Sequence, residues 1–309
     1  MSPRILRFIA EWLPRNAIRM RRLRLRWLEG WLRQKYDANT EPFPMRLHGF
    51  PIRLNGGNPY PFLLAENPFF NQPLAELVRQ VSNVHGRQLV IIDVGASLGN
   101  TVLLLQEQAA PTIARIHCIE ADHEFIKLLI ENTEQFPNVV LHQAMLAAEA
   151  KDVRSLVHHH PGSATAVGAH NVRATTIDEL LLLHASRFDI LKIDIDGSDG
   201  EALAGAQKML KRDQPAVIFE WHPALIHQTG NDPYKPFSVL SDAGYTRFLW
   251  FRNTGHFSHF SRPGDPEVET WMHYLRAMQP NADPHFDIVA LPTTLDSLGP
   301  KLASLGVLA

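Results

Sequence analysis

A glycine turn between an apolar run and a helical segment constrains the fold of this chain more than any other feature. Residues 89–92 are apolar and long enough for a buried parallel strand, and residues 101–106 suit a helix. Gly95, in the turn between them, can adopt backbone angles that other residues resist, and it leaves room for a nucleoside. The N–H groups that open the helix point toward a ligand above the strand. This arrangement predicts a nucleotide-binding site.

The spacing of the glycines distinguishes between ligands. A P-loop needs a lysine after its second glycine, and none follows Gly99. A dinucleotide fingerprint needs glycine at position 97, which is Ser97. The pattern Asp-x-Gly-x-x-x-Gly, which starts at Asp93, instead resembles the first motif of class I S-adenosylmethionine (SAM) methyltransferases.

From residue 89 onward, predicted strands and helices alternate. This order predicts an α/β fold, a doubly wound and mostly parallel sheet with helices on both faces. Strands are expected at 89–94, 115–119, 139–143, 188–193, 216–219, 245–251 and 286–291, the last two forming an antiparallel edge. Helices are expected at 98–109, 122–134, 177–183, 199–211 and 237–243, with a β excursion at 150–174.

The segments outside this core define the predicted domains. Residues 1–40 form a basic amphipathic helical arm, in which Pro14 is expected to end a first helix before a second at 15–36. Residues 41–85 are rich in Pro, Asn and Gly, and are predicted to form a linker and the elements that lead into the core. The catalytic domain spans 86–300 and contains a polar insert at 253–285.

Charge is distributed unevenly along the chain. The net charge is −2, but residues 1–36 carry nine arginines and Lys35 against Glu11 and Glu29, a local charge of +8. Arginine-rich helices with Trp and Leu suit an anionic membrane surface; the alternative is a helix packed on its own domain or on a second subunit. Nothing else in the chain supports nucleic-acid binding.

Location can be predicted from cysteine content and hydropathy. Cys118 is the one cysteine, so an intrachain disulfide is impossible and a reducing compartment is the default. No apolar run reaches the ~18 residues of a membrane span, and no segment resembles a signal peptide. We therefore expect a cytoplasmic protein, with peripheral contact at the inner membrane face as the alternative.

Glu120 is the first candidate for cofactor binding beyond the glycine turn. It ends the second predicted strand, where an acid can accept both ribose hydroxyls of an adenosine. Asp93 is expected to hold the glycine loop or to meet the amino group of the cofactor's methionine part. The predicted cofactor set is completed by the turn residues Gly95, Ala96, Gly99 and Asn100.

A second group of candidates follows the strand at 188–193. Asp194, Asp196 and Asp199 lie at a strand tip, where doubly wound folds place ligands. A calcium loop is excluded, because its sixth and twelfth positions would fall on Asp199 and Gly205. Two interpretations remain open for this tip. One is a glycosyltransferase Asp-x-Asp pair that holds a metal-bound sugar nucleotide, and the other is an active-site floor with Asp194 near the transferred group.

His222 is the third candidate. It follows the strand at 216–219 in the run Glu220-Trp221-His222-Pro223, where it could act as a general base or a ligand. A lone histidine in a loop is more often structural, so both interpretations stay open.

The order of five motifs resembles the FkbM family of SAM-dependent methyltransferases. The motifs are residues 92–100 (IDVGASLGN), 119–122 (IEAD), 174–180 (ATTIDEL), 189–197 (DILKIDIDG) and the pair Phe219-Glu220. The resemblance covers about residues 88–222. It implies a class I, Rossmann-like fold, SAM as the cofactor, and methyl transfer to a hydroxyl oxygen, often on sugars or polyketide-like natural products.

The resemblance also implies roles for individual residues. The glycine turn and Glu120 match the family's cofactor site, and Lys192, Asp194 and Glu220 match its polar strand-tip set. One departure concerns Asp196, because the family usually has Glu before this glycine. The departure leaves the acceptor, and any use of a metal, open.

These observations together predict a SAM-dependent O-methyltransferase. Asp194, Lys192 and His222 are the predicted catalytic residues, with Asp194 or His222 taking the hydroxyl proton; no metal ligand is assigned. The acceptor is expected to be a small molecule or glycan, and a homo-oligomer is an open alternative. A metal-dependent glycosyltransferase and a non-catalytic nucleotide-binding module are the competing interpretations.

Overall fold

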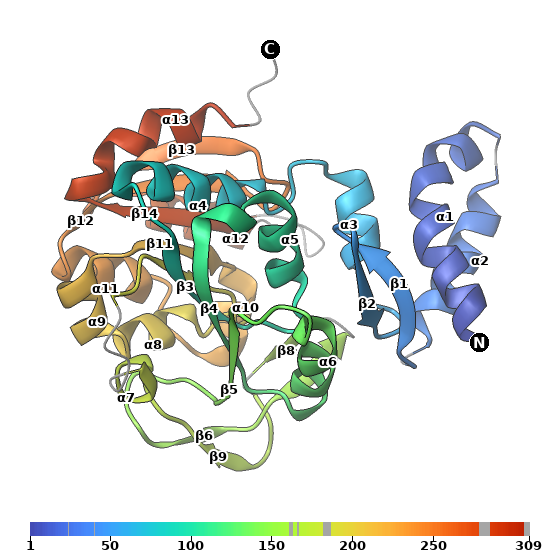
Figure 1. Ribbon diagram of the computed structural model, residues 1–309, viewed down its shortest axis with the longest axis horizontal. Helices are drawn as coiled ribbons and strands as arrows, with labels where there is room; N and C mark the ends of the chain where they lie inside the picture. The colour runs from blue at the N-terminus through green and yellow to red at the C-terminus, as the bar shows by residue number, and fades with distance from the viewer. Residues whose placement is uncertain are drawn as a thin grey trace.

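The computed structural model describes residues 1–23, 25–39, 41–160, 163–165, 167–181, 187–277 and 285–305. An eight-stranded sheet forms its centre, in the order β13-β12-β14-β11-β10-β3-β4-β5. Helices cover both faces of this sheet (Figure 1). Its strands are β3 (Leu89–Val94), β4 (Ile113–Glu120), β5 (Val139–Gln143), β10 (Ile190–Ile193), β11 (Ala216–Trp221), β12 (Tyr245–Arg252), β13 (Phe257–Ser261) and β14 (Phe286–Pro292).

The helices around the sheet are short to medium in length. They are α4 (Gln72–His85), α5 (Asn100–Gln108), α6 (His123–Thr133), α7 (Ile177–Leu181), α8 (Asp199–Ala204), α9 (Gln207–Asp213), α10 (Pro223–Thr229), α11 (Lys235–Asp242), α12 (Glu267–Ala277) and α13 (Gly299–Ala303). Two 3-10 helices, Ala110–Thr112 and Thr293–Leu298, precede β4 and α13. Residues 182–183 of the helix expected at 177–183 lie outside the described residues.

Strand direction confirms a doubly wound, mostly parallel sheet. β5, β4, β3, β10 and β11 pair in parallel, whereas β14 runs antiparallel between β11 and β12. Because β12 is antiparallel to β14, it runs in the same direction as the core strands. The last two predicted strands do form an antiparallel pair at this end of the sheet, as expected, but neither of them is the outermost strand. The edge strand is β13, which pairs antiparallel with β12.

Side chains on the two faces of the sheet build two hydrophobic cores. Ile92, Val94 and Leu191 point to one core, which the helices α8–α11 cover. Leu89 and Ile91 point to the other, which α4, α5 and α13 cover. Because successive strand residues face opposite sides, strands covered on both faces must be apolar throughout. This requirement explains why the apolar runs identified these strands.

The helix expected at 199–211 is divided in two. α8 ends at Ala204 and α9 begins at Gln207. A Cβ at Gly205 would lie 2.3 Å from the carbonyl oxygen of Ala147. The chain thus needs glycine where α8 meets the loop after β5.

The predicted helix break at Pro14 is also wrong. α1 (Pro3–Arg22) continues through Pro14 and ends at Arg22, and α2 (Arg26–Asp37) begins at Arg26. Proline weakens a helix by removing a hydrogen bond. Here the buried stripe of α1 extends on both sides of Pro14, from Leu6 to Met20, and its packing outweighs that loss.

The first 66 residues pack as one unit against the sheet domain. The hairpin of β1 (Phe43–Leu47) and β2 (Phe50–Leu54), followed by α3 (Tyr60–Glu66), lies between α1–α2 and the rest of the molecule (Figure 1). Tyr36 and Phe43 share a hydrophobic core with Leu103 of α5 and Phe125 of α6. Among the described residues, no helix has the length and hydropathy needed to cross a membrane.

The β excursion expected at 150–174 is present as two short antiparallel strand pairs, one between the strands of the other. β6 (Asp152–Arg154) pairs with β9 (Asn171–Arg173), and β7 (Val157–His160) pairs with β8 (Ser163–Thr165). Both lie apart from the central sheet. They bring the chain past the carboxyl ends of the strands, where ligands bind in folds of this type.

Candidate functional site

A cavity of about 460 Å³ opens at the carboxyl ends of β3, β4 and β10. This volume is within the ~300–1,000 Å³ range of small-molecule sites. β3 and β10 are neighbours in the sheet, and the chain order of the strands runs in opposite directions on either side of this pair. The loops after β3 and β10 therefore diverge and leave a crevice. Gly95, Glu120 and Asp194 line the cavity at its base, and the excursion formed by β6–β9 lines its outer side.

Gly95 is required by the close approach of two loops. Its φ of +75° is in the left-handed region that favours glycine, and a Cβ here would lie 1.8 Å from the carbonyl oxygen of Asp194. The Gly95 and Ala96 N–H groups donate to the Ile119 carbonyl, at 2.9 and 3.2 Å. The turn therefore joins the tips of β3, β4 and β10 beneath the cavity.

Glu120 lies where the cavity meets the glycine turn. Its Oε2 accepts the Ser97 N–H at 2.7 Å, and its Oε1 accepts the Asp122 N–H at 2.8 Å. Burial raises the pKa of Glu120 to about 7, although these backbone donors oppose the rise. The carboxylate is thus fixed in orientation, and each oxygen keeps a lone pair that can accept a ligand hydroxyl.

Asp93 and Lys192 form an ion pair beneath this surface. Lys192 Nζ lies 2.9 Å from Asp93 Oδ1 and 3.4 Å from Asp194 Oδ2, and it donates to the Gly95 carbonyl at 3.3 Å. Neither Asp93 nor Lys192 lines the cavity. Asp93 reaches the Gly95 loop through Lys192, and Lys192 contacts Asp194 from behind the cavity wall. The roles predicted for both residues stay predictions.

The remaining predicted cofactor residues support the turn without lining the cavity. Ala96 is buried, and Gly99 precedes α5 and packs against α6, where a Cβ would lie 3.1 Å from Thr133. Asn100 begins α5, and its Oδ1 is buried without a hydrogen-bond partner among the described residues. Of the predicted cofactor set, Gly95 and Glu120 therefore have direct access to a ligand.

Asp194 is the predicted catalytic residue that reaches the cavity. Its side chain is 50% exposed and lines the wall beside Gly95. Asp196 follows in a left-handed conformation, with φ of +50°, and also lines the cavity. The next residue, Gly197, accepts hydrogen bonds through its carbonyl from Asn231 Nδ2 at 2.9 Å and Thr229 Oγ1 at 3.2 Å. These bonds fix the turn that carries both carboxylates.

Further carboxyl groups are buried behind Asp194. Burial, followed by the charges of Asp194 and Asp196, raises the pKa values of Asp199 and Glu220 well above normal. Burial and the charge of Asp194 raise the pKa of Asp287 to about 7. These carboxyl groups do not line the cavity. The raised pKa values of Asp199 and Glu220 favour their protonated form.

His222 is not placed for acid–base chemistry in this cavity. It is the N-cap of α10, where its Nδ1 accepts the Leu225 N–H at 3.4 Å. Its ring stacks on His285 with centroids 4.7 Å apart, and it does not line the cavity. The geometry favours the structural interpretation of this residue.

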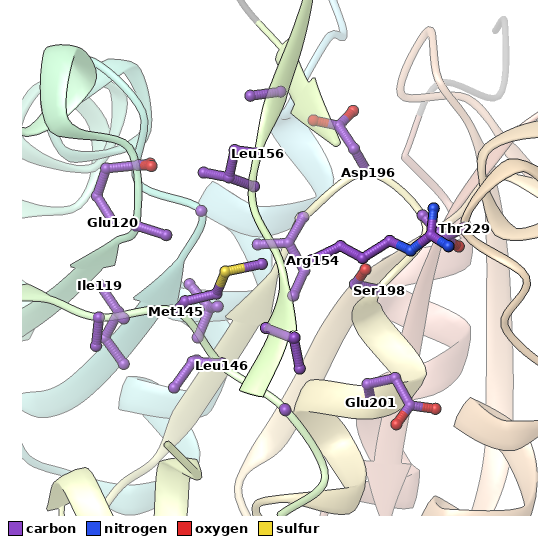
Figure 2. A pocket seen from close by; sticks show the side chains of 18 of the residues that line it. Ile119, Glu120, Met145, Leu146, Arg154, Leu156, Asp196, Ser198, Glu201 and Thr229 are labelled. Carbon is purple, nitrogen blue, oxygen red and sulfur yellow. The ribbon is translucent and has the colours of Figure 1, made fainter. Parts of the chain in front are cut away.

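The sequence did not identify the residues that close the cavity. Ile119, Phe125 and Met145 supply apolar lining. Figure 2 shows Ile119 and Met145 on the same side of the cavity as Glu120, while Arg154 of β6 reaches across from the excursion toward Ser198. Met145 could have been suspected, because it follows the third parallel strand at the same sheet edge as Glu120. Arg154 gave no local signal, since its position depends on how the excursion folds back.

Across the described ranges, no three His, Cys, Asp or Glu side chains are grouped closely enough to hold a metal ion. Asp194 is oriented by Lys192, which is a cation supplied by the chain itself.

Comparison with known proteins identifies the family of this chain. A family model described as "Methyltransferase FkbM domain" matches residues 93–247, half of the chain. None of the curated proteins compared matches the chain. Similar solved structures include a methyltransferase FkbM from Methylobacillus flagellatus KT, with 16% identity and a TM-score of 0.41 over 65% of this chain and 43% of that one. Another is Aeropyrum pernix fibrillarin with natively bound S-adenosyl-L-methionine, with 15% identity and a TM-score of 0.38 over 66% of this chain and 67% of that one.

Proposed function

Because this chain belongs to the FkbM family of SAM-dependent methyltransferases, we propose that it methylates a hydroxyl oxygen of a sugar, glycan or polyhydroxylated natural product. Family membership favours methyl transfer over the sugar transfer that the Asp194-x-Asp196 pair had left open. The finer assignment, of oxygen as the methylated atom, rests on the groups around the cavity.

The residues at the cavity fit SAM. Gly95 leaves the base of the cavity free of a side chain, and Glu120 presents an oriented carboxylate that would hold the ribose hydroxyls. Ile119, Phe125 and Met145 offer an apolar wall suited to an adenine ring. When bound, SAM supplies a methyl group on a positively charged sulfur.

The observation that carries the proposal is the position of Asp194. Its carboxylate borders the cavity next to Gly95, and Lys192 holds one of its oxygens. A hydroxyl must lose its proton as it gains a methyl group, so a fixed carboxylate within reach can act as the base. Lys192 orients Asp194, and the excursion carrying Arg154 limits the access of water.

The other cavity residues indicate the kind of acceptor. Away from the apolar wall, the lining includes hydroxyl, amide and charged side chains, namely Ser198, Asn171, Glu201, Lys151 and Arg154. Closely spaced donors and acceptors suit a molecule with several hydroxyl groups. Lys151 and Glu201 already have charged partners, Glu149 and Lys235, and a polyhydroxylated acceptor could add hydrogen bonds to Ser198 and Asn171.

A panel of acceptors tests the proposal. The full chain is incubated with isotopically labelled SAM and with sugars, glycans and polyols, alongside matched compounds in which an amine replaces the hydroxyl. We expect an O-methyl product, identified by NMR, and we expect Asp194→Asn to lower kcat by at least about 100-fold with an unchanged Kd for SAM. Methylation of nitrogen or carbon, or full activity of the variant, would contradict the proposal.

A further inference from the structure

The outer face of α1 and α2 concentrates exposed apolar side chains. Among the described residues, seven of the fourteen exposed large apolar side chains lie within residues 1–31. Trp27 is 68% exposed, Leu23 60%, Phe8 54% and Trp31 51%. Scattered single apolar residues are normal on a protein surface, but a contiguous group marks an interaction site.

These side chains form one surface across both helices. On α1, Ile5, Phe8 and Trp12 recur at three- and four-residue spacing, and the rings of Phe8 and Trp12 stack with centroids 5.4 Å apart. On α2, Trp27 and Trp31 are one turn apart. Ile5 and Trp31 line the same groove between the helices, so the two rows are continuous. We call this surface, Ile5, Phe8, Trp12, Leu23, Trp27 and Trp31, the arm patch.

The arm patch is not needed for packing within the chain. The opposite face of α1, from Leu6 to Met20, is the one buried against β1 and α3. α1 and α2 lie at one end of the molecule, with β1, β2 and α3 between them and the sheet domain (Figure 1). A large flat partner can therefore reach the arm patch without meeting the catalytic cavity.

Positive charge surrounds the arm patch. Arg15 and Arg19 continue the row of Ile5, Phe8 and Trp12 along α1, and Lys35 Nζ lies 6.0 Å from the centre of the Trp31 ring. Arg7 and Arg33 have carboxylate partners, Glu11 and Asp37. The structure shows no carboxylate partner, within the described part of the chain, for the exposed arginines Arg4, Arg15, Arg19, Arg22 and Arg26.

We propose that the arm patch binds the surface of an anionic lipid bilayer, with its tryptophans at the headgroup level and its arginines against the phosphates. Tryptophan and arginine are suited to this interface, because each combines an apolar body with a polar or charged end. A second copy of the chain is a poor occupant, because a two-fold dimer would bring two arms of charge +8 together. Nucleic acid could pair with the arginines but offers no hydrocarbon for Ile5 and Leu23.

Co-sedimentation with vesicles tests this inference on the full chain. We expect binding to phosphatidylcholine vesicles that contain about one-third phosphatidylglycerol, and little binding to phosphatidylcholine alone. Tryptophan emission should shift to shorter wavelength on binding, because Trp27 and Trp31 leave water. Added salt should weaken binding, since headgroup attraction is screened.

Two pairs of variants localise the effect. Trp27→Ser with Trp31→Ser, and separately Arg15→Gln with Arg19→Gln, should each lower the partition coefficient by about tenfold or more. Val84→Ser with Ile130→Ser is the apolar control, since these exposed residues lie on α4 and α6. Arg115→Gln with Arg262→Gln is the charge control, because both residues are exposed and outside the arm. All four should keep the unfolding temperature of the parent.

Several results would overturn the inference. These are equal binding to neutral and anionic vesicles, no binding to either, or arm variants that bind as well as their controls. Self-association of the parent that Trp27→Ser with Trp31→Ser abolishes would assign the arm patch to a protein dimer instead. Retention of single-stranded RNA, in place of vesicles, would assign it to nucleic acid.

Discussion

Lys192 Nζ lies 2.9 Å from Asp93 Oδ1, and these two residues face each other directly in the pairing of β10 with β3. Both are buried. Burial opposes the charge of Lys192, but the carboxylates of Asp93 and Asp194 outweigh it and raise the Lys192 pKa above its ordinary value. The ion pair thus fixes the two strand tips on which the glycine turn and the proposed base depend.

Loss of this lysine should destabilise the fold. Lys192→Met leaves the Asp93 carboxylate buried without a cation, a change that costs about 3–5 kcal/mol. Chemical denaturation measures the change in the free energy of unfolding, and Lys208→Met, at an exposed position of α9, is the control. Asp93→Asn in the same chain should recover part of the loss. A variant with parental stability but no turnover would instead assign Lys192 a direct catalytic role.

Gly95 should not tolerate even alanine. The added Cβ would overlap the Asp194 carbonyl oxygen, so the loop after β10 would have to move. We expect Gly95→Ala to lose roughly 3 kcal/mol of stability and to bind SAM much more weakly. Gly86→Ala is the matched control, because Gly86 also has a positive φ but no atom near its Cβ position, and strain alone costs about 1 kcal/mol. Similar effects at both positions would contradict a close approach at Gly95.

The raised pKa of Glu120 should make cofactor binding depend on pH. Because its pKa is about 7, the carboxylate that would accept the ribose hydroxyls is fully formed only above neutrality. Calorimetry should give a SAM Kd about tenfold higher at pH 6 than at pH 8. Glu120→Gln, which cannot ionise, should bind weakly and remove this dependence.

The same shift affects the stability of the ligand-free protein. The unfolded chain releases the Glu120 proton near the ordinary value of 4.5, whereas the folded chain holds it up to about 7. The folded state therefore binds more protons in this window, and the contribution of Glu120 to stability falls as the pH rises from about 4.5 to 7. A parental pH profile in Glu120→Gln would show that another group is responsible.

Arg154 should affect the acceptor and not the cofactor. It lines the cavity from β6, on the side proposed for the acceptor, while Glu120 lies on the opposite side (Figure 2). We expect Arg154→Ala to raise the acceptor KM by about tenfold or more without changing the SAM Kd. Arg173→Ala, on the paired strand β9 and outside the cavity lining, is the control. Equal losses in both variants would point to a general weakening of the excursion.

The core of the fold could be predicted because buried parallel strands must be apolar on both faces. That requirement made the runs ending at Val94 and Ile193 visible, and their glycine and acid tips followed. Segments whose fold depends on partners were less predictable. In β13, polar and apolar side chains are mixed and most are only partly buried, so its sequence gives no clear strand signal. α1 continues through Pro14 because its buried stripe packs against the hairpin of β1 and β2.

The residues of the site could be predicted where they adjoin a predicted strand. Gly95 and Asp194 directly follow strands and Glu120 ends one, so their place in the chain fixes their place at the sheet edge. His222 has the same sequence position relative to its strand, yet it caps α10 instead of lining the cavity. Arg154 lies on an excursion whose path no local pattern specifies. The distinction between lining the cavity and supporting it was set by packing.

Equilibrium binding of SAM to the full chain, measured by calorimetry, tests the central claim most directly. We predict one site per chain with a Kd below about 1 mM, and loss of measurable binding in Glu120→Ala while its unfolding temperature stays near that of the parent. Absence of binding by the parent protein, or unchanged affinity in a folded Glu120→Ala, would contradict the placement of the cofactor in this cavity.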